Sequence, residues 1–190
     1  MIIRRTLLNN CRRFGLVDCS NSARSNSTNS NPSPYLHDLV GDSSQPDGVK
    51  SVALVDVSPG TVVFREKGAI VSQAAMHSLQ IGVDSHCQID GDGRFTAHSF
   101  SPNLGVFINP HDTTPILFVA LKAISCGEEL SFDYTTTEWE LEKGGFVDIS
   151  TGRPVKGFRY LEEEEKRRLL EAGLLPAHVL QLWLSELLDA

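Results

Sequence analysis

The sequence predicts a mostly β fold of the α+β class, in which several short β-sheets are followed by a helical segment at the C-terminus. Short β-branched and apolar runs begin near Val49 and recur at close spacing, separated by Gly, Pro, Asn and Asp residues. From residue 162 onward, apolar side chains instead recur at helical spacing among charged ones. At 190 residues, the chain can form one domain of ordinary size plus a tail.

The β region begins with two runs that the turn Ser58-Pro59-Gly60 joins as a hairpin or a tight corner. We expect strands over residues 52–57, 61–64, 69–72, 77–82, 104–108 and 116–123, with short ones at 88–89 and 94–96. The turn Asp90–Gly93 separates these last two, and its glycines suit positive φ angles. The run 115–122 is apolar on both alternating faces, which predicts a strand buried on two sides.

The C-terminal segment predicts two helices. Three glutamates at 162–164 stand four residues before three basic residues at 166–168, a spacing typical of ion pairs on a solvated helix face. Gly173 is a candidate C-cap, and Pro176 suits the start of the next helix, over 177–188. One face of that helix is apolar, so we expect it to pack on the body or on a partner; it carries Val179, Leu180, Trp183 and Leu187.

The first 37 residues differ in composition from the rest, and we assign 1–37 to a flexible leader. The leader contains five arginines and one acid, although the whole chain has a net charge of −7, and residues 20–34 are mostly Ser, Asn and Pro. An Arg-rich, Ser-rich, acid-poor start is typical of a transit peptide, which predicts mitochondria or another organelle. The alternative is a disordered tail on a protein of the cytoplasm or nucleus.

Composition and spacing also exclude several classes of protein. No apolar run is long enough for a membrane span, and the acidic net charge argues against direct nucleic-acid binding. The four cysteines contain no C-x-x-C pair, so the sequence predicts neither a zinc knuckle nor a disulfide framework, and a reducing compartment is the simpler expectation. Nucleotide-binding and hydrolase signatures such as G-x-x-x-x-G-K-[ST] and G-x-S-x-G are absent from the sequence.

Three ordered motifs carry more information than composition. Gly127–Tyr134 reads G-E-E-L-S-F-D-Y, Ala97–Asn103 reads A-H-S-F-S-P-N, and Gly48–Gly60 reads G-V-K-S-V-A-L-V-D-V-S-P-G. They resemble G-E-E-L-x-F-D-Y, N-H-S-C-x-P-N and G-x-G-x-x-A-x-x-D-I-x-x-G of the SET domain, the fold of most protein-lysine methyltransferases. The resemblance covers residues 48 to 161 and implies a SET-type fold.

The resemblance implies a chemistry and a set of site residues. A SET enzyme binds S-adenosylmethionine on one face and admits a protein lysine through a channel from the other, so the implied partner is a protein or peptide with an accessible lysine. Tyr134 matches the residue at the methyl-transfer point, and the structural alternative is that it closes a core against Phe118 and Phe132. The positions implied to bind the cofactor are Gly48, Lys50, Ala97, His98, Ser99, Tyr134 and Phe158.

Several residues depart from the family pattern. Ala97 replaces the Asn that helps hold the cofactor, Lys50 replaces a Gly, and Phe100 replaces the Cys of the second motif. No cysteine follows Tyr134, and Asp148-x-Ser150 stands where C-x-C is expected, so we predict a zinc-free protein whose C-terminal lid includes Phe146 and Phe158.

Two functions remain open at this point. The first is S-adenosylmethionine-dependent methylation of a protein lysine, and the alternative is a non-catalytic SET-fold binding or scaffold protein. The expected organisation is a leader (1–37), a SET domain (48–137), a post-SET-like segment without cysteines (138–161) and C-terminal helices (162–190).

Overall fold

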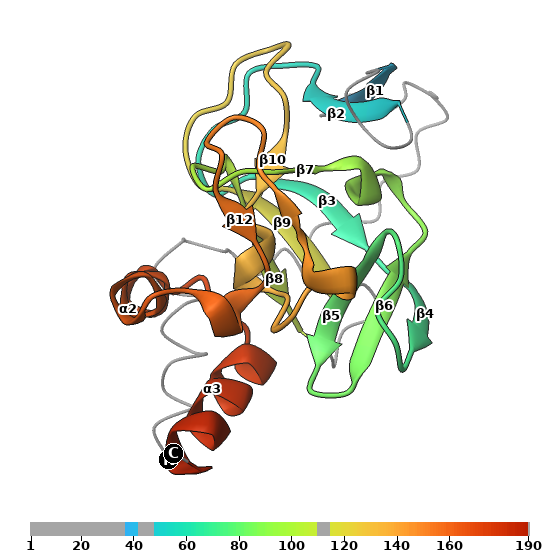
Figure 1. Ribbon diagram of the computed structural model, residues 1–190. Helices are drawn as coiled ribbons and strands as arrows, with labels where there is room; N and C mark the ends of the chain where they lie inside the picture. The colour runs from blue at the N-terminus through green and yellow to red at the C-terminus, as the bar shows by residue number, and fades with distance from the viewer. Residues whose placement is uncertain (1–36, 42–47, 110–114, 190) are drawn as a thin grey trace, which may run out of the picture.

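The strands of this computed structural model, which describes residues 37–41, 48–109 and 115–189, form five small sheets (Figure 1). The sheet orders are β3–β9–β8, β4–β6–β5, β1–β2, β7–β10 and β11–β12. The bounds are β1 His37–Gly41, β2 Val49–Ala53, β3 Val62–Glu66, β4 Gly68–Val71, β5 Ser78–Gly82, β6 Ser85–Ile89, β7 Ala97–His98, β8 Leu104–Ile108, β9 Ile116–Ala120, β10 Ser131–Phe132, β11 Phe146–Val147 and β12 Pro154–Val155. The predicted mostly β fold with a helical C-terminus is confirmed.

The central strand of the main core is β9, which pairs with both β3 and β8 in antiparallel register. Its side chains Ile116, Phe118, Val119 and Ala120 are fully buried, as the apolar run predicts for a strand covered on two faces. Phe118 packs edge-on against Phe64 and Phe132 at 5.4 Å between ring centroids. This core fixes the position of β10, from which the chain continues into Tyr134.

The first two expected strands are arranged differently from the prediction. β2 ends at Ala53 and pairs with β1, a strand that the sequence analysis did not identify. β3 pairs with β9, so residues 58–60 form a tight corner and not a hairpin. The Gly60 N–H donates to the Ala120 carbonyl over 2.8 Å, and the residue has a φ of 82°, which favours glycine.

The structure around the predicted turn at Asp90–Gly93 also differs from the prediction. Residues Asp92–Phe95 form a short 3₁₀ helix (η1) and not a strand, and the φ of Gly91 is −88°. The glycines are required because the Glu66 side chain lies against them. A Cβ on Gly91 would lie 2.1 Å from Glu66 Oε2, and the Gly93 N–H donates to Glu66 Oε1 over 2.8 Å. Close approach, and not a positive φ, explains this Gly pair.

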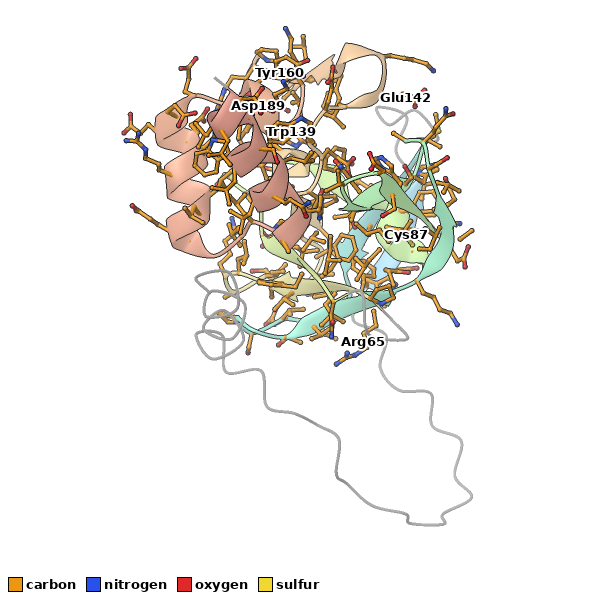
Figure 2. The ribbon with its side chains drawn as sticks, turned by 90° about the horizontal axis from the view of Figure 1, so that it is seen from below. Arg65, Cys87, Trp139, Glu142, Tyr160 and Asp189 are labelled. Carbon is orange, nitrogen blue, oxygen red and sulfur yellow. The ribbon has the colours of Figure 1, made fainter. Side chains whose placement is uncertain are left out.

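Two helices, α2 (Glu163–Ala172) and α3 (Ala177–Asp189), cover the side of the molecule away from β1 and β2 (Figure 1). Gly173 adopts the left-handed conformation at the end of α2, with φ 74°, as its C-cap role predicts. The helices form a second core, next to Trp139 in Figure 2; it contains Phe158, Leu169, Leu175, Val179 and Trp183. Within α3, Leu187 and Leu188 remain exposed.

One side chain of the charged run 162–168 is buried and not solvated. The Lys166 side chain is buried, its Nζ lies 5.8 Å from the centroid of the Phe158 ring, and Glu163 accepts its hydrogen bond at 3.2 Å. Long lysine side chains can cover apolar surface while their ammonium group keeps a polar partner.

The leader expected at 1–37 lies outside the described residues except for His37. Among the helices that the structure describes, none combines the length and the apolar character that crossing a bilayer requires.

Candidate active site

A cavity of about 870 Å³ opens between the sheet β4–β6–β5 and the paired strands β7 and β10. Four segments provide most of its lining: residues 74–79, 93–99, 129–134 in part, and 146–150. The second and third of these segments overlap the motifs Ala97–Asn103 and Gly127–Tyr134. The cavity therefore gathers residues that are far apart in the sequence.

The two motifs meet because β7 and β10 pair in parallel. Ala97 lies opposite Ser131 and His98 opposite Phe132, and the Ser99 N–H donates to the Phe132 carbonyl over 3.0 Å. Ala97, His98 and Ser99 all line the cavity. Tyr134 begins the 3₁₀ helix η2 (Tyr134–Thr136), which Asp133 separates from β10, and it lines the same cavity.

Tyr134 combines a packed ring with a fixed hydroxyl. Its ring centroid lies 4.6 Å from that of Phe132 and 5.2 Å from that of His98. Its hydroxyl donates to the Thr96 carbonyl oxygen over 2.7 Å. The ring thus extends the core, as the structural alternative expects, and Tyr134 also lines the cavity, as the functional interpretation requires.

His98 is a buried, neutral histidine. Its Nδ1 accepts the Tyr134 backbone N–H over 3.2 Å, so the ring hydrogen is on Nε2. Burial lowers the pKa of His98 to about 4; the Asp148 carboxylate acts in the opposite direction and the Arg153 guanidinium reinforces the decrease. Asp133 lies 4.0 Å from Nδ1, but a neutral ring forms no ion pair with it.

Two buried polar atoms at the cavity lack partners. Within the described ranges, neither His98 Nε2 nor Thr96 Oγ1 has a hydrogen-bond partner. Both residues line the cavity on either side of Ala97. A buried polar group without a partner is costly, so these two atoms favour a polar ligand in the cavity.

The structure separates the other expected cofactor residues. Gly48 and Lys50 flank Val49, which lines the cavity, and the Lys50 ammonium lies 3.7 Å from Glu129 Oε2. Phe158 does not line the cavity: its ring is fully buried in the second core, with its centroid 5.4 Å from that of Trp183. Of the two residues expected in the lid, only Phe146 reaches the cavity.

Glu138 is a cavity residue that the sequence analysis missed. Its Oε1 accepts the Gln80 backbone N–H over 2.8 Å, and its Oε2 lies 3.8 Å from His86 Nδ1. Burial raises its pKa to about 7. The only sequence signal was a single glutamate between threonines and a tryptophan, which does not reveal burial.

Comparison with known proteins identifies a family and similar solved structures. A family model described as the SET domain matches residues 9–135. A search of curated proteins found no match. Similar solved structures include a candidate histone methyltransferase from Plasmodium falciparum (15% identity, TM-score 0.40, covering 50% of this chain and 91% of that one). They also include CpSET8 from Cryptosporidium (24% identity, TM-score 0.41, covering 50% of this chain and 56% of that one, little more than half its length).

Proposed function

This chain belongs to the SET domain family, and on that premise we propose that it is an S-adenosylmethionine-dependent methyltransferase that acts on a lysine side chain of a protein. The observation that carries the proposal is the position of Tyr134. It lines the same cavity as His98, and it comes from the motif that resembles the family pattern at every fixed place.

The cavity lining fits a polar cofactor. His98 Nε2–H offers a hydrogen-bond donor, and Thr96 Oγ1 offers a donor and an acceptor, for the polar groups of a bound nucleoside or amino acid. When bound, S-adenosylmethionine supplies a methyl group on a positively charged sulfur. The segment 97–99 would hold it with backbone groups and His98, because Ala97 has no polar side chain.

The Tyr134 hydroxyl is suited to orient an amine. Its hydrogen is directed at Thr96, so a lysine N–H approaching it meets the phenolic oxygen as an acceptor. Holding the amine in one orientation lowers the entropic cost of the reaction. A lysine with a pKa near 10.4 costs about 4.6 kcal/mol to deprotonate at pH 7, and the buried apolar ring of Phe132 in the cavity lining reduces that cost.

The charge of the cavity lining favours a basic substrate segment. Glu129, Glu142 and Asp148 line the cavity, and the whole chain has a net charge of −7. Complementary charge increases the rate at which a lysine-containing peptide meets this face.

The alternative is a SET-fold protein that binds or organises partners without methylating them, and Ala97 is the residue that favours it. Calorimetry with S-adenosylhomocysteine separates the two functions. We expect saturable binding to the full chain, with no heat for adenosine plus homocysteine at equal concentration. Absence of binding would favour the non-catalytic protein.

A further inference from the structure

The hairpin β11–β12 forms one wall of the cavity, yet its own pairing is short. Only Phe146 with Val155 and Val147 with Pro154 are in register, and Pro154 has no N–H to donate. The Phe146 ring reaches the site, with its centroid 5.6 Å from that of His98 and 6.1 Å from that of Tyr134. An isolated two-residue ladder is marginal in water, so contacts with the rest of the molecule must hold this wall in place.

Arg153, in the loop of the hairpin, makes two of these contacts, in addition to the burial of Val155. Its guanidinium carbon lies 4.0 Å from the centroid of the Phe100 ring, and its Nη2 donates to Glu165 Oε1 on α2 over 2.7 Å. The Phe100 ring in turn packs edge-on against His98 at 4.6 Å. A guanidinium that stacks on an aromatic ring while it pairs with a carboxylate is a directional anchor, and lysine does not reproduce it.

Zinc does not fit the equivalent positions in this chain. Where the family pattern has cysteines, the chain has Phe100, Asp148 and Ser150. A phenyl ring is not a metal ligand, and the Asp148 carboxylate accepts hydrogen bonds from Ser150 and Thr151 of its own turn. Among residues 37–41, 48–109 and 115–189, no three His, Cys, Asp or Glu side chains are grouped to hold a metal ion.

We propose that Arg153 and Phe100 form a clasp that holds the β11–β12 hairpin against His98, so that Arg153 is a positioning residue for the cavity wall carrying Phe146. The clasp links three parts of the chain: α2 through Glu165, the hairpin through Arg153, and the His98 segment through Phe100. Only its consequence for cofactor affinity rests on the proposed function.

The first test measures the hairpin itself, without any ligand. Amide hydrogen exchange is followed at Asp148, whose N–H donates to Arg153, and at Gly152, whose N–H donates to Asp148, with Ala120 as the core reference. In Arg153→Ala we expect exchange at both hairpin amides to rise at least ~10-fold with Ala120 unchanged. The control Arg159→Ala removes an exposed arginine that pairs with Glu186 and Glu140, and should leave the hairpin unchanged.

Further variants separate the stacking from simple charge. Arg153→Lys keeps the charge and should restore only part of the protection. Phe100→Leu should loosen the hairpin less than Arg153→Ala, because the hydrogen bond from Arg153 to Glu165 remains. The double variant should be no looser than Arg153→Ala alone, because that change already removes the contact between Arg153 and Phe100. Unchanged hairpin exchange in Arg153→Ala, or an equal rise at Ala120, would overturn the clasp.

The ligand measurement distinguishes the two proposals. If both hold, Arg153→Ala binds S-adenosylhomocysteine about tenfold more weakly than the wild type, and Arg159→Ala binds it equally. A wild type that binds no S-adenosylhomocysteine, together with a loosened hairpin in Arg153→Ala, would overturn the proposed function and keep the clasp. A loosened hairpin with unchanged affinity would overturn the positioning role of Arg153.

Discussion

The Tyr134 hydroxyl donates a 2.7 Å hydrogen bond to the carbonyl oxygen of Thr96, 38 residues earlier in the chain. This bond connects Tyr134 to the residue just before the motif Ala97–Asn103 and fixes the direction of the phenolic hydrogen. The neighbouring backbone makes a second connection, since the Tyr134 N–H donates to His98 Nδ1. Tyr134 is therefore held at both ends, by its main chain and by its hydroxyl.

Tyr134→Phe should abolish most methyl transfer while leaving the fold intact. The substitution keeps the ring that packs on Phe132 and deletes the oxygen proposed to orient the amine. Loss of a positioned polar catalytic group predicts a decrease in rate of about 10²-fold. The measurement is radiolabelled methyl transfer to peptide and lysate substrates, with Tyr160→Phe, an exposed tyrosine bonded to Glu140, as the control. Equal rates for both variants would remove Tyr134 from the catalytic centre.

Ala97→Asn should tighten cofactor binding. Ala97 lines the cavity beside His98, and an amide there regains the side-chain donor and acceptor of the family pattern. One buried hydrogen bond regained is worth roughly 1–3 kcal/mol, which is a 5- to 150-fold change in affinity. Calorimetry with S-adenosylhomocysteine measures it, and Ala97→Leu is the apolar control. An affinity no higher than that of the wild type would show that residue 97 does not face the cofactor.

Glu138 makes stability depend on pH. Its pKa rises from 4.5 in the unfolded chain to about 7 in the fold, so the protonated form is the one that the fold favours. This stabilisation is complete below pH 4.5 and is lost as pH rises through 7. The glutamine side chain in Glu138→Gln cannot ionise. The free energy of unfolding of this variant, measured relative to that of the wild type, should therefore increase by up to about 3 kcal/mol between pH 4.5 and 8.

Urea unfolding at pH 4.5 and pH 8 tests this prediction. The facing group, His86, lies 3.8 Å from the Glu138 carboxylate, and burial lowers its pKa, so the same comparison is made in His86→Phe. The exposed Glu142 provides the control variant, Glu142→Gln. If the difference between Glu138→Gln and the wild type is the same at both pH values, Glu138 is not a buried acid with a raised pKa.

Phe158→Leu should reduce stability without affecting the cavity. Phe158 is fully buried against Trp139 and Trp183, in the core that the helices cover, and it does not line the cavity. Replacing a buried ring by a smaller side chain costs about 1–2 kcal/mol here. Urea unfolding and S-adenosylhomocysteine calorimetry report the two effects separately. A large loss of affinity at a temperature where the variant is folded would place Phe158 at the site after all.

Local sequence patterns predicted the elements that depend on local chemistry. The apolar run at β9, the Gly173 C-cap and the helix after Pro176 all follow from propensity and periodicity, and the structure contains each of them. The shift of β2 and the existence of β1 could not be predicted this way, because both depend on a pairing between strands.

Only the site residues that belong to sequence motifs could be predicted. The two motifs indicated His98 and Tyr134, but the parallel pairing of β7 with β10 that unites them is a long-range contact. Glu138 was missed because the surrounding chain determines its burial. Phe158 was assigned to the cofactor site from the family resemblance, which does not reveal that its ring joins the second core. Lys166 was assigned to a solvated helix face because its charge does not reveal that its side chain packs near the Phe158 ring.

The most direct test of the proposed function is mass spectrometry of the methylated product. The full chain is incubated with S-adenosylmethionine carrying a deuterated methyl group and a library of lysine-containing basic peptides, and each product is fragmented to locate the label. The proposed function predicts deuterated methyl groups on lysine ε-nitrogens, formed by the wild type, at increased yield by Ala97→Asn, and at least ~10²-fold less by Tyr134→Phe. Absence of labelled lysine with both the wild type and Ala97→Asn, or label only on another residue type, would contradict it.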